Sequence, residues 1–327
     1  AFIAILIVYI FLRNAVLVRM AFRNVKRRPG QSVLIISGLM LATAIISSSF
    51  TMGDSITFSI KRSATEGLRS MDQILRVDED SEAWKGKPVP EHFSESLITD
   101  LLPVLEADPD IDGILPILEA DVVVINNRSR QFEVNALFTG LDSQKSKVYE
   151  PLYDLDGLPV DLLSLASDEV YIDRDGAVEL GVEVGDVLGL VLGPGELQQM
   201  SVRAIVDGWY YKRSNTEVVL MINLPQAQSL LGLEGQLSSV LISNTGDAFS
   251  GETLSSRIVK RYEDIPAIKD KGLEVYPVKS KAIEFANLIG SLFVSFFTTF
   301  GLFSIGVGLL LIFLIFSMLA AERRSEM

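Results

Sequence analysis

The sequence predicts a membrane protein in which α-helical transmembrane segments hold a mixed α/β extracytoplasmic domain. Three observations point to this fold class. Charged residues are almost absent near both ends of the 327-residue chain, they are frequent in its middle, and a basic cluster follows the first apolar run. A membrane protein with one long soluble insertion has this distribution of apolar and charged residues.

Residues 1–18 form the first apolar segment, which Arg13 and Asn14 interrupt. The segment is shorter than the roughly 20 residues of a full span. We therefore expect the C-terminal part of a transmembrane helix, with an interfacial helix as the alternative. A cleavable signal peptide does not fit, because the basic cluster follows the apolar run instead of preceding it.

Residues 19–31 combine basic side chains with interspersed apolar ones. On a helix the apolar side chains can face lipid while the cations reach head groups. This pattern predicts a cytoplasmic interfacial helix, which Pro29-Gly30 then interrupts. Its basic residues are Arg19, Arg23, Lys26, Arg27 and Arg28.

Residues 32–53 hold no charge and are long enough to span a bilayer. The segment is rich in small residues such as Gly38, Ala42 and Ser47. Small residues allow helices to approach closely in lipid. We therefore expect a transmembrane helix that packs against a neighbour, continued above the membrane by a helix over residues 55–70.

Residues 285–321 form a second charge-free stretch, bounded by Glu284 and Glu322. As a helix it would be roughly 55 Å long, which exceeds the hydrocarbon core of about 30 Å. The excess predicts a stalk that continues into a transmembrane helix. We place the stalk over 286–297 and the lipid-embedded part over 301–320.

The basic cluster also predicts the orientation. Lys and Arg are enriched in cytoplasmic loops, so residues 13–31 should be cytoplasmic and residues 54–284 outside. The second charge-free stretch then returns the chain, which places residues 322–327 in the cytoplasm.

Residues 54–284 carry the acidity of the chain. Residues 1–53 contribute six positive charges and residues 285–327 are neutral, so the net charge of −13 leaves −19 for this region. A domain this acidic should not bind nucleic acid. Its apolar patterns predict mixed α/β structure. We expect strands over 73–77, 114–118, 120–125, 132–139, 169–172, 188–192, 201–206, 218–222 and 240–243, and helices over 93–107, 174–180, 224–231 and 253–261. Residues 273–278 precede the stalk.

No pattern in the sequence predicts a catalytic, cofactor or metal site. The chain has no cysteine, no phosphate-binding loop and no nucleophile motif. The single histidine, His92, is best interpreted as a solvated helix-start residue. The acidic run from Asp78 to Glu82 lacks regular calcium-ligand spacing, and Trp209-Tyr210-Tyr211 is either a binding surface or a packing element.

Several segments resemble a known family. Residues 19–29 (RMAFRNVKRRP), followed by a small-residue span and Gly53-Asp54-Ser55, resemble the start of FtsX-like permeases. The run from Glu169 to Val187 and the later Ala204-Ile205-Val206-Asp207 resemble the MacB-like periplasmic core domain. Residues 322–327 (ERRSEM) resemble the opening of that family's coupling segment. The extra apolar segment at 1–18 departs from the simplest members.

The resemblance implies a permease of an ABC transporter in a bacterial cytoplasmic membrane. It implies three partners: a cytoplasmic ABC ATPase that hydrolyses ATP, a second permease copy or homologue, and an extracytoplasmic adaptor or lipoprotein. The permease itself would then not be an enzyme, and Glu322, Arg323 and Arg324 would face the ATPase. Two alternatives stay open: an FtsX-like transmitter that activates a cell-wall hydrolase, and a membrane-anchored sensor domain.

Overall fold

The computed structural model describes residues 29–193, 196–207, 218–247 and 250–324. Its contacts divide the chain into two compact units. The helical unit comprises Ala1–Ile60 and Phe285–Met327, and the α/β unit comprises Lys61–Glu284. Two long helices, α3 (Pro29–Leu68) and α10 (Val278–Arg324), contribute residues to both units.

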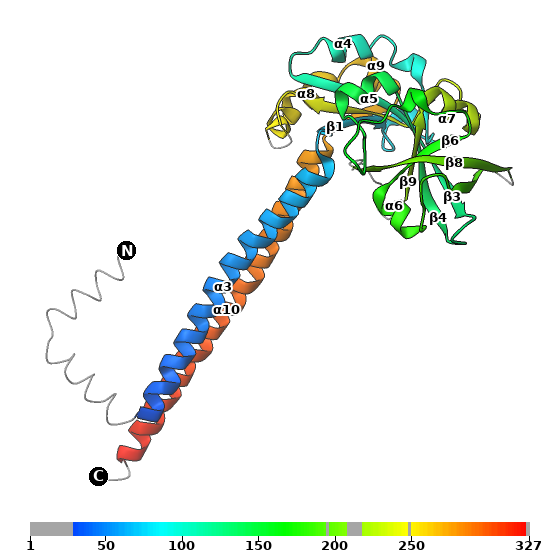
Figure 1. The fold of residues 1–327 in the computed structure, drawn as a ribbon. Coiled ribbons are helices and arrows are strands. Elements are labelled where there is room, and N and C mark those ends of the chain that lie inside the picture. Colours follow the sequence, from blue (N-terminus) through cyan, green and yellow to red (C-terminus); the bar gives the residue numbers. More distant parts are fainter. Residues whose placement is uncertain (1–28, 194–195, 208–217, 248–249, 325–327) are drawn as a thin grey trace. The chain divides into compact units, whose positions relative to one another are not determined.

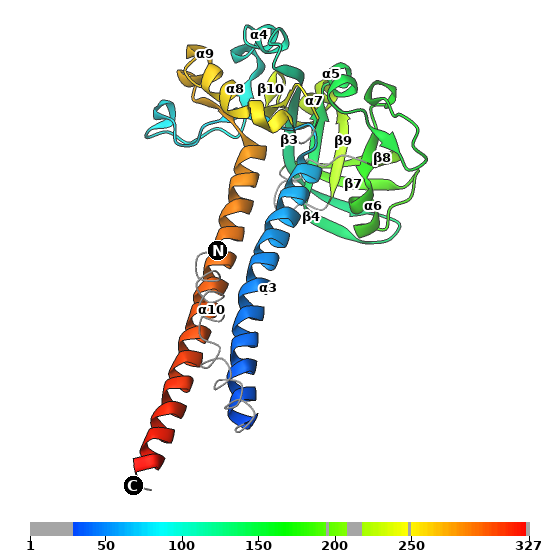
Figure 2. The same cartoon turned by 90° about the vertical axis from the view of Figure 1, so that its left-hand side faces the viewer.

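The helical unit consists, in its described part, of α3 up to Ile60 and α10 from Phe285. The two helices run side by side in both views (Figures 1 and 2). In the described part of the chain, α3 extends from Pro29 to Leu68. The predicted helical character of residues 32–53, 55–70 and 286–320 is thus confirmed nearly to its limits. By length and composition alone, Ile36–Leu68 and Val278–Leu310 could each cross a membrane.

The α/β unit is built on a large mixed sheet and a small separate one. Its strands are β1 (Gln73–Val77), β2 (Phe93–Ser94), β3 (Ile111–Asn126), β4 (Phe132–Leu141), β5 (Tyr153–Asp154), β6 (Glu169–Asp173), β7 (Val187–Gly193), β8 (Glu196–Asp207), β9 (Val219–Asn223), β10 (Gln236–Leu237), β11 (Ser239–Asn244) and β12 (Leu273–Tyr276). Its shorter helices are η1 (Glu82–Trp84), η2 (Glu95–Leu97), α4 (Leu102–Glu106), α5 (Ser143–Tyr149), η3 (Leu162–Ser164), α6 (Arg174–Glu179), α7 (Leu224–Leu231), η4 (Gly251–Leu254), α8 (Ser255–Tyr262) and α9 (Pro266–Lys269).

Strand β3 organises the large sheet because its two halves have different neighbours. Its first half pairs with β11, which continues through β1 to β12. Its second half pairs with β7, and β4 lies along its other edge. The described strands therefore close a ring in the order β3-β4-β9-β6-β8-β7, from which the β11-β1-β12 sheet extends.

The apolar core occupies both faces of the sheet. One cluster fills the inside of the ring and continues under α4, α7, α8 and α9; it includes Phe138, Leu190 and Leu220. The other lies on the opposite face, where Tyr149 of α5 and Leu162 of η3 cover Leu115 and Met221. Full burial of such side chains contributes about 1.5–3 kcal/mol each, so the sheet is anchored from both sides.

The structure corrects three sequence expectations. Residues 93–107 do not form one helix: Phe93–Ser94 pair with β10, Leu97 ends η2, and Leu102 and Leu105 belong to α4. His92 therefore does not start a helix; it is half-buried, with Nε2 3.1 Å from the carbonyl oxygen of Glu119. The strands expected over 114–118 and 120–125 are one continuous strand, β3, and the other expected strands are present.

Candidate functional site

The residues that the sequence singled out for the membrane interface lie outside the described residues: Arg19, Arg23, Lys26, Arg27 and Arg28. Trp209-Tyr210-Tyr211 also lies outside them. Glu322, Arg323 and Arg324 are the last residues of α10. Their backbone continues the helix without a break, so the segment expected to face an ATPase belongs to the same helix as the rest of α10.

Two glycines form the close contact within the helical unit. Gly53 of α3 and Gly290 of α10 are both buried. A Cβ at Gly53 would overlap the side chain of Val294, and a Cβ at Gly290 would overlap Thr57 Oγ1 and lie 3.5 Å from the carbonyl oxygen of Gly53. Glycine at both positions lets the backbones approach, as in helix pairs packed within membranes.

These contacts define the register of the pair. Because Gly53 meets Val294 and Thr57 meets Gly290, four residues forward on α3 correspond to four residues backward on α10. The helices are therefore antiparallel, and Asp54 lies near the level of Phe293. Less exposed residues continue along α10 every three or four positions from Gly290 and Val294, at Phe297, Gly301 and Ile305.

The α/β unit receives both helices at one polar junction. Helix α3 ends at Leu68, and Arg69 follows with a φ of 38°. A residue other than glycine in the left-handed region costs roughly 1–2 kcal/mol. Two contacts hold Arg69 there: its guanidinium lies 2.6 Å from Glu150 Oε1, and its carbonyl oxygen accepts a 2.6 Å hydrogen bond from Lys279 Nζ.

The centre of the junction is a buried ion pair between Asp72 and Lys279. Lys279 Nζ lies 2.7 Å from Asp72 Oδ1, and the two side chains are 0% and 2% exposed. Asp72 directly precedes β1, and Lys279 is the second residue of α10. The backbone N–H of Lys279 also donates to the carbonyl oxygen of Asp72, at 3.3 Å. The pair thus joins the residues after α3 to the first turn of α10.

The ion pair is fixed to the sheet by further hydrogen bonds. Asp72 Oδ2 accepts from the backbone N–H of Asn244 at 2.9 Å, and its own N–H donates to Ile242. Gln73 Nε2 donates to Ser255 Oγ at 2.9 Å. Burial raises the pKa of Asp72, against the opposing effect of Lys279. Burial also raises the pKa of Glu150, which Arg69 opposes.

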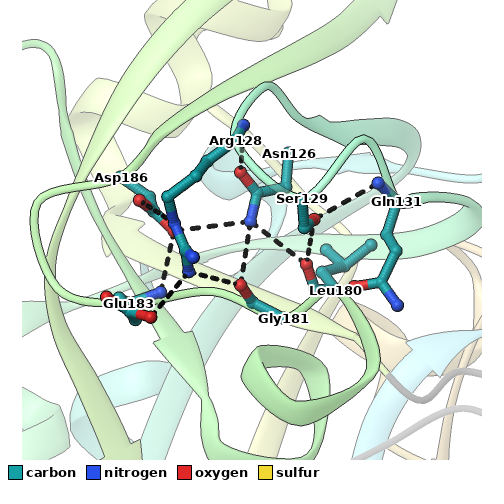
Figure 3. Close-up of polar contacts among 8 residues, drawn as sticks. All are labelled: Asn126, Arg128, Ser129, Gln131, Leu180, Gly181, Glu183 and Asp186. Carbon is teal, nitrogen blue, oxygen red and sulfur yellow. Dashed lines mark hydrogen bonds and ion pairs between the residues drawn. The ribbon is translucent and has the colours of Figure 1, made fainter.

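A second polar cluster lies at the far end of β3, and it contains the motif that suggested the family (Figure 3). The turn after β3 contacts the loop from Leu180 to Asp186. Asn126 is fully buried, and its amide nitrogen donates to the carbonyl oxygens of Leu180 and Gly181, at 3.1 and 3.2 Å. Ser129 Oγ donates to Leu180 as well, at 2.7 Å.

Arg128 and Asp186 close this cluster. Arg128 Nε donates to Asp186 Oδ1 at 2.8 Å, and Arg128 Nη2 donates to the carbonyl oxygen of Gly181 at 2.7 Å. Gly181 has a φ of 58°, and a Cβ there would lie 2.7 Å from Gln131 Oε1, so the loop requires glycine at this position. Leu180-Gly181 and Val184-Gly185-Asp186, the Leu-Gly and Val-Gly-Asp motif within the run from Glu169 to Val187, therefore form a loop that holds the β3–β4 turn.

This cluster predicts a pH-dependent contribution to stability. The hydrogen bond from Arg128 lowers the pKa of Asp186, and burial opposes it more weakly. A carboxyl whose pKa falls on folding stabilises the protein above its unfolded pKa of about 3.9, and this contribution is lost as pH falls through the folded pKa. We expect Asp186→Asn to destabilise the protein at neutral pH and progressively less toward pH 2.

Urea unfolding of the whole chain in detergent, followed by tryptophan fluorescence, measures this effect. Both tryptophans, Trp84 and Trp209, belong to the α/β unit, so the signal reports on that unit. Asp156→Asn, in an exposed turn, is the matched control and should leave the pH profile unchanged. If the free energies of unfolding of the wild type and Asp186→Asn differed by the same amount from pH 7 to pH 2, the stabilising role of the ionised Asp186 carboxylate would be contradicted.

Neither polar cluster has the composition of a catalytic centre. Among the described residues, no group of three or more His, Cys, Asp or Glu side chains could hold a metal ion. In the acidic run, Asp78 and Glu82 make local contacts: Asp78 Oδ1 accepts from the N–H of Asp80, and Glu82 pairs with Lys85.

Comparison with known proteins gives structural matches only. No protein-family model and no curated protein matches the sequence. The chain resembles the extracellular domain of the ABC-type transporter YknZ from Gram-positive bacteria, at 13% identity and a TM-score of 0.41, covering 62% of this chain and 98% of that one. It also resembles the periplasmic region of MacB from Actinobacillus actinomycetemcomitans, at 10% identity and a TM-score of 0.42, covering 67% and 94%.

Proposed function

We propose that this chain forms part of the permease subunit of an ABC transporter and transmits ATP-driven motion to an extracytoplasmic domain. The observation that carries the proposal is the close-packed, antiparallel pair of helices α3 and α10, which contain the charge-free segments 32–53 and 285–321 and continue into one acidic α/β unit. The basic segment before α3 and the Glu-Arg-Arg end of α10 then meet the cytoplasmic face. The domain exports or extrudes a substrate.

The surface of the helix pair supports a membrane location. Many large apolar side chains of α3 and α10 are more than half exposed within the chain, which lipid or neighbouring helices would cover. They include Val33, Ile36, Met40, Leu41, Phe50, Phe296, Phe300, Leu302, Phe303, Leu309, Leu310, Phe313 and Leu314.

The register of the pair refines the membrane boundary. The charge-free part of α3 ends at Gly53, because Asp54 follows. Near the level of Asp54 on α10 lies Phe293, so the lipid-embedded part of α10 begins close to Val294, earlier than the residue 301 expected from sequence. Residues 29–53 would then span roughly 37 Å at 1.5 Å per residue, enough for a bilayer core of about 30 Å.

The proposed mechanism is mechanical. Charged side chains that could line a polar pore are absent from residues 32–53 and 285–321, whereas α10 is a continuous helix from Val278 to Arg324. A displacement at its cytoplasmic end can therefore be passed along its axis. ATP hydrolysis occurs in a separate cytoplasmic subunit, and a second permease copy completes the transporter.

A hydrolase-activating transmitter would use the same helices and the same ATPase, so it remains the second candidate. A membrane-anchored sensor needs no rigid connection between the Glu-Arg-Arg segment and the α/β unit. The continuity of α10 through Arg324 favours the two ATPase-coupled functions over the sensor.

Insertion of two glycines after Ala321 tests the coupling. In the full-length permease with its ATPase, we expect normal membrane insertion and ATP binding, but loss of the link between ATP hydrolysis and transport. Rigid transmission needs a fixed geometry, whereas head-group attraction of about 1 kcal/mol per basic residue tolerates displacement. Arg323→Lys should retain any anchoring role.

The control is the same insertion after Gly157, in an exposed turn with a φ of 77° and no atom within 4 Å of a Cβ. This variant should keep full coupling. Full coupling in the Ala321 insertion variant would rule out transmission through α10 and would favour the anchored sensor.

A further inference from the structure

Lys279 carries a charged side chain that is fully buried, which the burial of apolar surface does not explain. Its side chain is fully buried, and its ammonium group bridges two segments: the carboxylate of Asp72 at 2.7 Å and the carbonyl oxygen of Arg69 at 2.6 Å. The next basic residue of α10, Lys281, is half exposed and pairs with Glu284 within the same helix. Only the first of these lysines ties α10 to another part of the fold.

A buried ion pair is weak evidence for a gain in stability. Replacing such a pair with apolar residues is often neutral or stabilising, because both charges must be desolvated. What the pair does provide is geometric selectivity, since each charge is satisfied in one arrangement only. Here that arrangement fixes the first turn of α10 against the residues that follow α3.

The backbone at the same point is also held out of its preferred conformation. Arg69 has a positive φ without being glycine, and it is retained by Glu150 on its side chain and by Lys279 on its carbonyl oxygen. Strained residues at functional positions persist where the surroundings over-determine them. Asp72 is further tied to β11 through Asn244 and Ile242.

We propose that Lys279 is a positioning residue. It holds the end of α3 and the start of α10 in one fixed arrangement with strands β1 and β11, so that these segments move together. This inference rests on the proposed transmission function, because a fixed connection at this point is needed only if the helices pass motion to the α/β unit. Without it, motion of α10 would be absorbed at its first turn and would not reach the ring of strands.

The test uses the complete chain in lipid nanodiscs, with nitroxide labels on Gln199→Cys of β8 and Glu284→Cys of α10. Both positions are exposed, both belong to the α/β unit, and the chain has no native cysteine. The key variant is Asp72→Asn with Lys279→Met. It removes both charges together and keeps an amide oxygen at residue 72 to accept from Asn244.

We expect this double variant to melt near the wild-type temperature while its label-to-label distance distribution broadens roughly twofold. Lys281→Met is the matched control and should keep the narrow wild-type distribution. A double variant with an unchanged distribution would show that the pair does not position α10, and would overturn the proposal.

A second measurement needs no substitution at the junction. In the labelled chain with Asp72 and Lys279 intact and its ATPase bound, the distance between the labels at residues 199 and 284 should be the same without nucleotide and with trapped ATP. The reason is that the ion pair keeps the start of α10 fixed relative to the sheet. A shift of this distance would overturn the proposal even if the double variant failed to fold. Absence of any functional ATPase would refute the proposed function, whereas the nanodisc measurement would still test whether Lys279 positions α10.

Discussion

Replacing Lys279 with methionine should lower the free energy of unfolding of the α/β unit by about 3–5 kcal/mol, the cost of leaving one charge of a buried pair uncompensated. The Asp72 carboxylate is 2% exposed and would have no cation beside it. The carbonyl oxygen of Arg69 would also lose its donor. Urea unfolding of the whole chain in detergent, followed by tryptophan fluorescence, measures the change.

Two comparisons make this prediction specific. Lys281→Met removes the same functional group two residues further along α10, where the lysine is half exposed, and should cause no measurable loss. Asp72→Asn combined with Lys279→Met should recover most of the stability, because no unpaired charge remains buried. If Lys279→Met were as stable as the wild type, the buried pair would not exist as described.

Gly53→Leu should separate α3 from α10. A side chain at this position would overlap Val294 and press against the backbone of Gly290. Forcing extra atoms into a packed contact costs about 1–3 kcal/mol, which corresponds to a roughly tenfold loss of the paired state for each 1.4 kcal/mol. In the cysteine-free chain, Thr57→Cys with Gly290→Cys reports on the pairing.

Thr57→Cys removes the Oγ1 atom that a Cβ at residue 290 would overlap. The two Cβ atoms would then lie 3.0 Å apart, closer than the roughly 3.5–4.5 Å of a disulfide, so the bond requires a small outward shift of the helices. We expect fast oxidative cross-linking in membranes, slowed roughly tenfold by Gly53→Leu. Gly306→Leu is the control, since no atom lies within 4 Å of a Cβ at that position. Equal cross-linking with Leu at residue 53 would disprove the register.

Local signals account for what the sequence predicted well. Helix α7 was predicted to the residue, because Pro225 marks its start and Gly232, with a φ of 65°, ends it. The helix predicted over 93–107 failed for the opposite reason. Its apolar spacing suited a helix, but Phe93 and Ser94 pair with Leu237 and Gln236, a long-range contact that periodicity does not reveal.

In the candidate site, too, the residues that are close in sequence could be predicted and those far apart in sequence could not. The Leu-Gly and Val-Gly-Asp motif was visible because its residues are close in sequence, although its role as a clamp on Asn126 required the structure. Asp72 and Lys279 were not singled out, because more than 200 residues separate them and neither stands in a motif. A lysine close to the start of a long apolar helix is the one signal that could have drawn attention to the pair.

The central claim is that the α/β unit lies on the extracytoplasmic side of the membrane and that the C-terminal end of α10 lies on the cytoplasmic side. It is tested most directly by single cysteines at Asn127, which is exposed in the turn after β3, and at Ser325, just beyond α10. A membrane-impermeant thiol reagent applied to intact cells, after access through any outer membrane has been provided, should label Asn127→Cys and not Ser325→Cys. Permeabilising the cytoplasmic membrane should make the two equal. Equal labelling in intact cells, or labelling of Ser325→Cys alone, would contradict the account.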